Sequence, residues 1–194
     1  MEAPKEIKVI FVGDHNVGKT CIVNRAVNNQ FGPVMITIGA VFASLEREFN
    51  NEKYLIQIWD TSGQEKYKSL TPMYYRQSDI ALLVYSINDE ASFKKIDAWM
   101  KDIRQYAPQD CVVIIVSNKN DLEEKERIVP RDVGSAKAQS LGLEFVEVSA
   151  KSGMGIQDLL DMIPKIYTEI PNNKALKKNP KIQEQENNQK SCKC

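Results

Sequence analysis

Short apolar segments recur along this chain, and segments whose apolar residues follow a helical spacing separate most of them. The apolar segments predict six strands, near residues 5–12, 40–49, 53–60, 79–86, 111–117 and 143–148. The helical spacing predicts helices near residues 18–28, 66–76, 90–106, 130–140 and 155–168. Alternation of strands and helices is typical of a doubly wound α/β domain. We therefore expect a mostly parallel six-stranded sheet with helices on both faces.

The predicted strands differ in the faces that they bury. Residues 80–85 and 112–116 are apolar throughout, which is typical of central strands covered by helices on both faces. Residues 41–49 alternate more, as an edge strand with one solvated face does, and Asn50 and Asn51 predict a hairpin turn after them. We therefore expect the two strands that flank this turn to be antiparallel.

Apolar stripes mark the core-facing sides of two predicted helices. The stripes are Phe93, Ile96, Met100 and Ile103 in one helix, and Ile156, Leu159, Leu160, Ile163 and Tyr167 in the other. Asp89 precedes the first of these helices as a candidate N-cap. Pro164 is expected to interrupt or kink the last helix, because proline removes a backbone donor and clashes with the preceding turn.

The composition is that of an ordinary soluble protein. The chain has 194 residues, of which 42% are hydrophobic and 27% charged, and its formal net charge is zero. This length fits one domain with a sizeable core, and the balanced charge gives no basic field to attract nucleic acid. We expect no membrane span and no signal peptide, because no apolar run is long enough and residues 1–6 are charged. Residues 171–194 are polar, so we expect a flexible tail after a domain over residues 1–170.

A glycine-rich segment, Gly13–Thr20, follows the first predicted strand and opens the first predicted helix. It matches G-x-x-x-x-G-K-[ST], the pattern of a phosphate-binding P-loop, in the context that this pattern requires. Backbone N–H groups of such a loop favour an anion, the Lys19 ammonium would reach the β- and γ-phosphates, and the Thr20 hydroxyl would offer an oxygen to Mg²⁺. A glycine-rich turn without a ligand is the alternative for this segment alone. The candidate phosphate contacts are Asn16, Val17, Gly18, Lys19, Thr20 and Cys21.

The segment Asp60–Gln64 ends the third predicted strand and supplies the pattern D-x-x-G-Q. Asp60 would face the metal, Gly63 would bring a backbone N–H to the γ-phosphate, and Gln64 would orient an attacking water. Thr37 lies in the loop before the second strand, where it would ligate Mg²⁺ and sense the γ-phosphate through its backbone N–H. The predicted metal-site residues are Thr20, Thr37 and Asp60, and the predicted catalytic residues are Gln64, Lys19 and Thr37.

A second polar segment, Asn118–Asp121, follows an apolar strand and has the pattern N-K-x-D. The Asp121 carboxylate could accept two hydrogen bonds from a guanine edge that adenine does not present, and this kind of polar match discriminates strongly. The aliphatic stem of Lys119 could lie along the base, and a backbone N–H after the sixth strand could meet the guanine oxygen. A polar turn is the alternative for N-K-x-D alone. The candidate base contacts are Asn118, Lys119, Asp121, Ser149, Ala150 and Lys151.

Taken together, these segments resemble a small GTPase of the Ras superfamily, and more closely a Rab, over about residues 5–170 and again at the C-terminus. The Rab-like stretches are 37–39, 53–60, 74–76, 83–87 and Cys192-Lys193-Cys194. The resemblance implies a P-loop NTPase small G domain that binds GTP or GDP with Mg²⁺ and hydrolyses GTP. It implies a monomeric switch in vesicle traffic, with Phe31 against the guanine. It also implies that effectors read an aromatic triad of Phe42, Trp59 and Tyr74, for which packing alone is the alternative.

The C-terminal resemblance implies lipid attachment. In Rabs both cysteines of such an ending, here Cys192 and Cys194, carry geranylgeranyl groups, and unmodified cysteines are the alternative. Two lipids give a stable anchor where one gives only marginal binding. The implied location is the cytoplasmic face of an endomembrane with cycling into the cytosol, and the implied partners are a GAP, an exchange factor and a GDP-dissociation inhibitor. Cys21 and Cys111 instead indicate packing thiols in a reducing compartment.

Several positions depart from the Rab pattern. The segment between Lys19 and Thr37 is one residue shorter than is common and carries Pro33, and Val41 stands where Rabs usually have Asp. His15 stands where Ras-like proteins usually carry a small residue, and in that family bulky residues there crowd the catalytic Gln and any arginine finger. We hypothesise that hydrolysis is therefore slow. The alternative is that His15 points to solvent and has little effect.

The leading interpretation is a GTP/GDP switch, and two rivals remain. One is a GTP-binding scaffold with impaired hydrolysis because of His15, and the other is a P-loop kinase for a small molecule, which leaves N-K-x-D and the cysteine ending unexplained. No Arg is evident at a position for an arginine finger in cis, so we expect unaided hydrolysis on the order of 10⁻⁴ per second.

Overall fold

A computed structural model describes residues 3–64, 71–122 and 124–170 of the chain. Its strands are β1 (Lys5–Val12), β2 (Ala40–Phe49), β3 (Glu52–Thr61), β4 (Ile80–Ser86), β5 (Val112–Asn118) and β6 (Glu144–Glu147). Its helices are α1 (Lys19–Asn28), α2 (Thr71–Tyr75), α3 (Glu90–Lys94), α4 (Ile96–Tyr106), α5 (Arg131–Ser140) and α6 (Ile156–Glu169), and Glu124–Glu126 form a 3₁₀ turn. The predicted tail, 171–194, lies outside the described residues.

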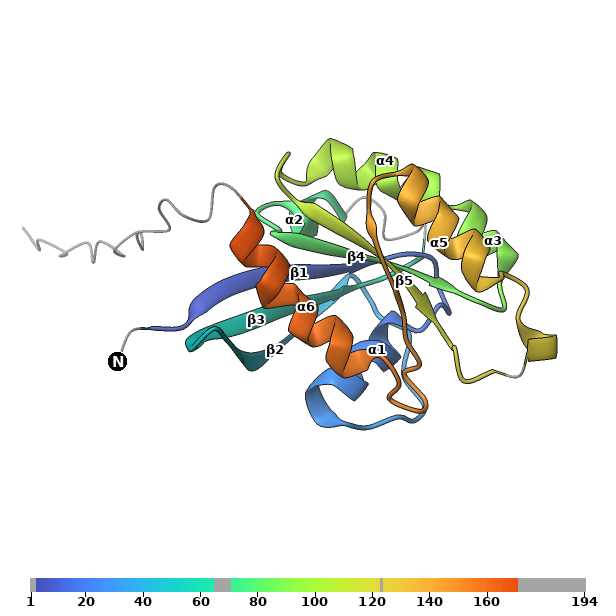
Figure 1. Cartoon of the computed structure of the whole chain (residues 1–194), viewed down its shortest axis with the longest axis horizontal. Coiled ribbons are helices and arrows are strands. Elements are labelled where there is room, and N and C mark those ends of the chain that lie inside the picture. The colour runs from blue at the N-terminus through green and yellow to red at the C-terminus, as the bar shows by residue number, and fades with distance from the viewer. Residues whose placement is uncertain (1–2, 65–70, 123, 171–194) are drawn as a thin grey trace, which may run out of the picture.

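The strands form one six-stranded sheet in the order β2-β3-β1-β4-β5-β6 (Figure 1). Only the pair β2 and β3 is antiparallel, and β2 is an edge strand, as predicted. The turn between these strands places Asn50 and Asn51 at φ 52° and 62°. Positive φ at both central residues is typical of a tight hairpin turn, which asparagine tolerates well. The fold class predicted from the sequence is therefore confirmed.

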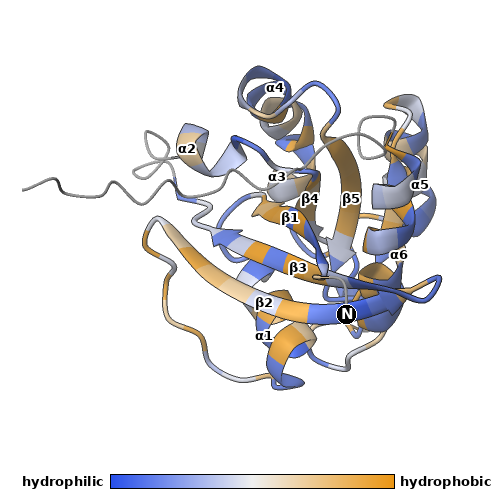
Figure 2. Ribbon diagram, turned by 90° about the vertical axis from the view of Figure 1, so that its left-hand side faces the viewer, coloured by the Kyte–Doolittle hydropathy of each residue, from blue (hydrophilic) through white to orange (hydrophobic). Residues whose placement is uncertain are grey.

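Helices cover both faces of the sheet, and each face has its own hydrophobic cluster. On one face α1 and α6 pack against the strands, and all five apolar residues of the predicted α6 stripe are buried. On the other face lie α2, α3, α4 and α5, with Ile96 and Ile103 buried. Figure 2 shows the hydrophobic colour concentrated along the central strands β1, β4 and β5 between these helices. Because parallel strands all end at one edge, this arrangement brings the loops after β1, β3, β5 and β6 together.

Two details of the predicted helices need correction. The segment 90–106 is not one helix, since it divides at Lys95 into α3 and α4. Asp89 caps α3 as predicted, because its carboxylate accepts from the Ser92 backbone N–H at 3.2 Å. Pro164 lies inside α6 and does not interrupt it. Burial of Pro164 within the packed face of α6 provides tertiary contacts that offset the lost hydrogen bond. Of the predicted helix 66–76, residues 66–70 lie outside the described residues.

The internal cysteines pack as predicted. Cys111 is buried, and Cys21 is partly buried against the core. Burial raises the pKa of both thiols, to about 11 for Cys111. Within the part of the chain that the structure describes, no helix has both the length and the apolar character to cross a bilayer.

Candidate functional site

The P-loop lies between the end of β1 and the start of α1, as the strand–loop–helix pattern predicts. Gly13, Asn16 and Gly18 adopt positive φ values of 140°, 60° and 93°. A Cβ on Gly13 would collide with the Val84 carbonyl, so the loop needs glycine there for space as well as for conformation. The loop therefore has the curled backbone that directs N–H groups toward an anion.

Lys19 begins α1 and is almost fully buried. Its Nζ donates to the carbonyls of Gly13 and Asp14 at 2.9 and 2.8 Å, which holds the ammonium across the loop. Burial lowers the pKa of Lys19 to about 8, although the negative charges of Asp60 and Asp14 act in the opposite direction. A buried cation that has only loop carbonyls as hydrogen-bond acceptors is well placed to receive phosphate oxygens.

Three predicted metal-site residues meet beside this lysine. The Thr20 hydroxyl donates to Asp60 Oδ2 at 2.6 Å, and the Thr37 hydroxyl lies 2.9 Å from the Thr20 hydroxyl and 3.2 Å from Asp60 Oδ2. The second carboxylate oxygen, Asp60 Oδ1, is buried and has no hydrogen-bond partner among the residues that the structure describes. Burial raises the pKa of the Asp60 carboxyl, against the hydrogen bonds and the Lys19 charge that lower it. The structure thus joins three segments that are separate in the sequence into one cluster of oxygens.

The D-x-x-G segment lies directly on the P-loop. A Cβ added to Gly63 would collide with the backbone of Asp14 and His15, so this close approach requires glycine. The Gln64 backbone N–H lies 3.3 Å from the Ser62 hydroxyl, and Ser62 is nearly buried. One pocket is lined by residues from the P-loop, the loop before β2 and the end of β3. Its lining includes His15, Lys19, Thr20, Thr37, Gly63 and Gln64.

The predicted base contacts form a second, already bonded cluster. Asn118 is buried, donates to the Val17 carbonyl at 2.8 Å and accepts from the Ala150 N–H at 3.2 Å. Asp121 accepts from the Ser149 hydroxyl at 2.6 Å through one oxygen, and its other oxygen lies 3.5 Å from Lys151 Nζ. The loops after β5 and β6 are thereby tied to each other and to the P-loop.

Three other residues predicted to contact the nucleotide are not part of this hydrogen-bonded cluster. Lys119 adopts φ 71° and its Nζ lies 3.5 Å from Asn88 Oδ1, at the limit of a hydrogen bond. Phe31 is half exposed in the loop after α1. Cys21 lines the phosphate pocket from the first turn of α1. The roles predicted for these three residues remain predictions.

The predicted aromatic triad assembles on the sheet surface. Phe42 pairs with Trp59 across β2 and β3, and their ring centroids lie 5.4 Å apart. The ring centroid of Tyr74, in α2, lies 5.8 Å from that of Trp59. Phe42 is 53% exposed, so a partner can reach it.

Two positioning contacts were not predicted from the sequence. Arg25 of α1 donates to the carbonyls of Ala150 and Lys151 at 2.9 and 2.8 Å, and so it holds the loop after β6. Lys95 reaches the P-loop and donates to Asp14 Oδ2 at 2.6 Å. Arg25 lies 125 and 126 residues from its two partners, and Lys95 lies 81 residues from Asp14, so no local pattern could have found these contacts.

A curled P-loop, a buried lysine, a cluster of hydroxyl and carboxylate oxygens and a polar cluster behind them define a nucleoside triphosphate-binding protein of the P-loop class. A profile described as "Ras family" matches residues 8–169. Yeast (Saccharomyces cerevisiae) "Ras-related protein SEC4" is 36% identical over 172 residues, covering 88% of this chain and 79% of that protein. Human "Ras-related protein Rab-22A" is 42% identical over 158 residues, covering 81% of each chain. Arabidopsis thaliana "Ras-related protein RABE1d" is 39% identical over 160 residues, covering 82% of this chain and 74% of that protein.

The chain belongs to the Ras family and, within it, to the Rab small GTPases. It is a GTP phosphohydrolase that binds GTP and GDP and works as a switch in vesicle traffic, with effectors, GAPs and exchange factors as its classes of partner. The resemblance to Rab GTPases that the motifs indicated is confirmed. The rival interpretation, a P-loop kinase for a small molecule, does not agree with this assignment.

Proposed function

We propose that the phosphate half of the site holds GTP together with one Mg²⁺. The observation that carries this proposal is the convergence of the Thr20 and Thr37 hydroxyls on one oxygen of Asp60. Hydroxyl and carboxylate oxygens are the donors that Mg²⁺ prefers, and the second Asp60 oxygen is buried with no hydrogen-bond partner among the described residues. When bound, Mg²⁺ would neutralise the negative charge that develops on the transferring phosphate.

The chain's own groups would do the rest of the work. The Lys19 ammonium would leave the Gly13 and Asp14 carbonyls for oxygens of the β- and γ-phosphates. Backbone N–H groups of Thr37 and Gly63 would bind the γ-phosphate, and Gln64 would orient a water in line with the bond to the β-phosphate. Attack by that water breaks this bond and leaves GDP and inorganic phosphate. Catalysis by these groups is therefore mainly positioning and charge stabilisation.

The base half would select guanine. Ser149 donates to Asp121 Oδ1, and Lys151 Nζ lies 3.5 Å from Oδ2. The carboxylate oriented in this way would accept two hydrogen bonds from the guanine edge. Asn118 would fix the distance between this acceptor and the phosphates, because it bonds the P-loop and the loop after β6 at once.

The ending Cys192-Lys193-Cys194 would place this switch on a membrane. Two geranylgeranyl groups would anchor the protein stably on the cytoplasmic face of an endomembrane, and removal by a GDP-dissociation inhibitor would return it to the cytosol. The protein would act as a monomer, with effectors reading the exposed Phe42 beside Trp59 and Tyr74.

The second candidate function is a GTP-binding scaffold with impaired hydrolysis. Gly63 rests against the backbone of Asp14 and His15, and His15 and Gln64 line the same pocket. The His15 side chain is also 59% exposed, which favours the alternative that it has little effect. A ring at this place would restrict both the Gln64 side chain and an arginine supplied by a GAP.

Single-turnover GTP hydrolysis by the native protein and by His15→Ser, each with and without a broad-specificity Rab GAP, tests both candidates. Strong stimulation of the native protein supports a cycling switch. Lack of stimulation that His15→Ser restores supports the scaffold. Failure of both proteins to hydrolyse GTP, with nucleotide still bound, would contradict the roles proposed for Thr37, Gly63 and Gln64.

A further inference from the structure

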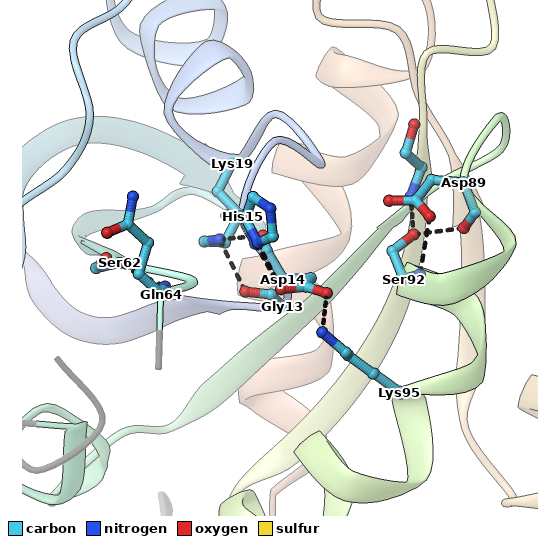
Figure 3. A network of polar contacts seen from close by, with 10 residues as sticks. Gly13, Asp14, His15, Lys19, Ser62, Gln64, Asp89, Ser92 and Lys95 are labelled. Atoms are coloured by element: carbon cyan, nitrogen blue, oxygen red, sulfur yellow. Dashed lines mark hydrogen bonds and ion pairs between the residues drawn. The ribbon is translucent and has the colours of Figure 1, made fainter. Parts of the chain in front are cut away.

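The side chain of Asp14 joins His15 to a residue from the opposite side of the site (Figure 3). Asp14 Oδ1 accepts from the His15 backbone N–H at 2.9 Å and lies 3.0 Å from His15 Nδ1. Asp14 Oδ2 accepts from Lys95 Nζ at 2.6 Å. The Asp14 side chain is only 8% exposed, while the Lys95 and His15 side chains are 46% and 59% exposed. A nearly buried carboxylate therefore bridges two solvent-accessible groups.

The chemistry of this carboxylate assigns the proton on the imidazole ring. Burial by itself would raise the pKa of Asp14, but the hydrogen bonds from Lys95 and His15 outweigh burial and the pKa is lowered. An ionised carboxylate only accepts hydrogen bonds, so Nδ1 of His15 carries the hydrogen that faces it. The contact thus fixes both the orientation of the ring and the nitrogen that is protonated.

Lys95 and the His15 backbone N–H together set which way the Asp14 carboxylate faces. The terminal torsion of an aspartate is broad, so the plane of its carboxylate is set by its partners rather than by a rotamer well. Lys95 holds Oδ2, and the His15 backbone N–H holds Oδ1 on the side of the imidazole ring. Loss of Lys95 would leave the carboxylate held at one oxygen only, so its plane could turn and the contact with Nδ1 would loosen. Lys95 itself sits at the break between α3 and α4, and the capping contact between Asp89 and Ser92 fixes the start of α3.

The orientation of the ring matters because of what surrounds it. His15 lines the phosphate pocket together with Lys19 and Gln64, and Gly63 lies directly against the backbone of Asp14 and His15. A ring that is tethered here stays beside the group expected to orient the attacking water. A ring free of Asp14 could turn away into solvent.

We propose that Lys95 is a positioning residue for His15: by holding the Asp14 carboxylate, it fixes the imidazole ring at the rim of the phosphate pocket, and through the ring it slows GTP hydrolysis. The second clause rests on the scaffold function proposed above, whereas the first stands on the contacts alone.

Nuclear magnetic resonance of the imidazole nitrogens tests the positioning directly, because the chain contains a single histidine. The GDP-bound native protein should show one tautomer, with hydrogen on Nδ1. Lys95→Met should show an average over both tautomers, and Lys95→Arg should restore the native spectrum. Lys94→Met is the matched control, because Lys94 is the neighbouring lysine and pairs with Glu90 instead. A native spectrum for Lys95→Met would overturn the proposal.

Single-turnover hydrolysis by Lys95→Met, His15→Ser and the double variant tests the consequence. We expect Lys95→Met to speed hydrolysis about threefold and His15→Ser about tenfold, since small displacements of reacting groups change rates by up to about a hundredfold. In the His15→Ser background, Lys95→Met should not change the hydrolysis rate further. An equal gain in both backgrounds would show that Lys95 acts elsewhere and would overturn the second clause. If His15→Ser leaves the rate unchanged, slow hydrolysis through His15 fails, and the spectra still decide whether Lys95 positions the ring.

Discussion

The two halves of the nucleotide site are built differently. In the base half, the side chains of Asn118, Asp121 and Ser149 are bonded to one another or to neighbouring loops. In the phosphate half, the loop before β2 is attached through the Thr37 hydroxyl and, at its end, through the Gly39 carbonyl, which accepts from the Ser62 N–H. Met35 and Ile38 in this loop are 90% and 72% exposed. Figure 2 shows hydrophobic colour on this loop, on the outside of the fold.

On the function proposed above, this difference would separate recognition of the base from switching. A preassembled polar cluster loses little conformational entropy when it binds a base, so it can recognise guanine in either nucleotide state. A loop with few buried contacts opens easily, so one added phosphate can shift its equilibrium. The exposed apolar residues beside Thr37 also mean that the position of this loop changes the surface that a partner meets.

Asp121→Asn should give the largest effect and act on the base half alone. The amide would present a donor to the two donors of the guanine edge, so affinity for GDP and GTP should fall by about a thousandfold or more. Xanthine carries a carbonyl where guanine has its amine, so affinity for xanthosine diphosphate should rise in the same variant. Calorimetry with both diphosphates measures this. Loss of guanine binding with no gain for xanthine would mean that the variant fails for another reason.

Thr37→Val should separate the two nucleotide states. The substitution keeps the shape of the side chain and removes the hydroxyl that contacts Thr20 and Asp60. Affinity for GDP should stay within about twofold, while affinity for a non-hydrolysable GTP analogue should fall about tenfold, about the value of one hydrogen bond to a charged group. Competition against a fluorescent GDP measures both. An equal loss for both nucleotides would contradict a γ-phosphate sensor.

Arg25→Met should give the smallest effect and shows how the base half is supported from α1. The variant loses the two hydrogen bonds to the carbonyls of Ala150 and Lys151. We expect GDP to dissociate about fivefold faster, consistent with about 1 kcal/mol for a lost hydrogen bond. Arg131→Met is the matched control, because Arg131 is exposed and pairs with Glu147. Stopped-flow displacement of fluorescent GDP should show no change in the control, and equal rates in both variants would remove Arg25 from this role.

Much of the fold and of the candidate site could be predicted, because the signals are local. A period of two or a continuous apolar run gave all six strands, and the turn at Asn50 and Asn51 identified the antiparallel pair. Three errors or omissions share one cause, which is that tertiary packing and not the local sequence decides the outcome. Pro164 remains helical because α6 is packed, the helix boundary at Lys95 has no local breaker, and the supports from Arg25 and Lys95 join residues far apart in the sequence.

The sequence by itself determined the class of this protein, because glycine spacing, N-K-x-D and D-x-x-G-Q each state a local chemical requirement. The family comparison confirms that class. The sequence also showed that these segments follow strands, which is sufficient to predict that they meet at the edge of the sheet where the parallel strands end. Only the tertiary structure decided how the segments are held there: that Thr20 and Thr37 share one oxygen of Asp60, and that Asp14 links His15 to Lys95. The physical reason is that hydrogen bonds depend on distances of a few tenths of an ångström between distant segments, and only packing of the whole sheet and its helices sets those distances.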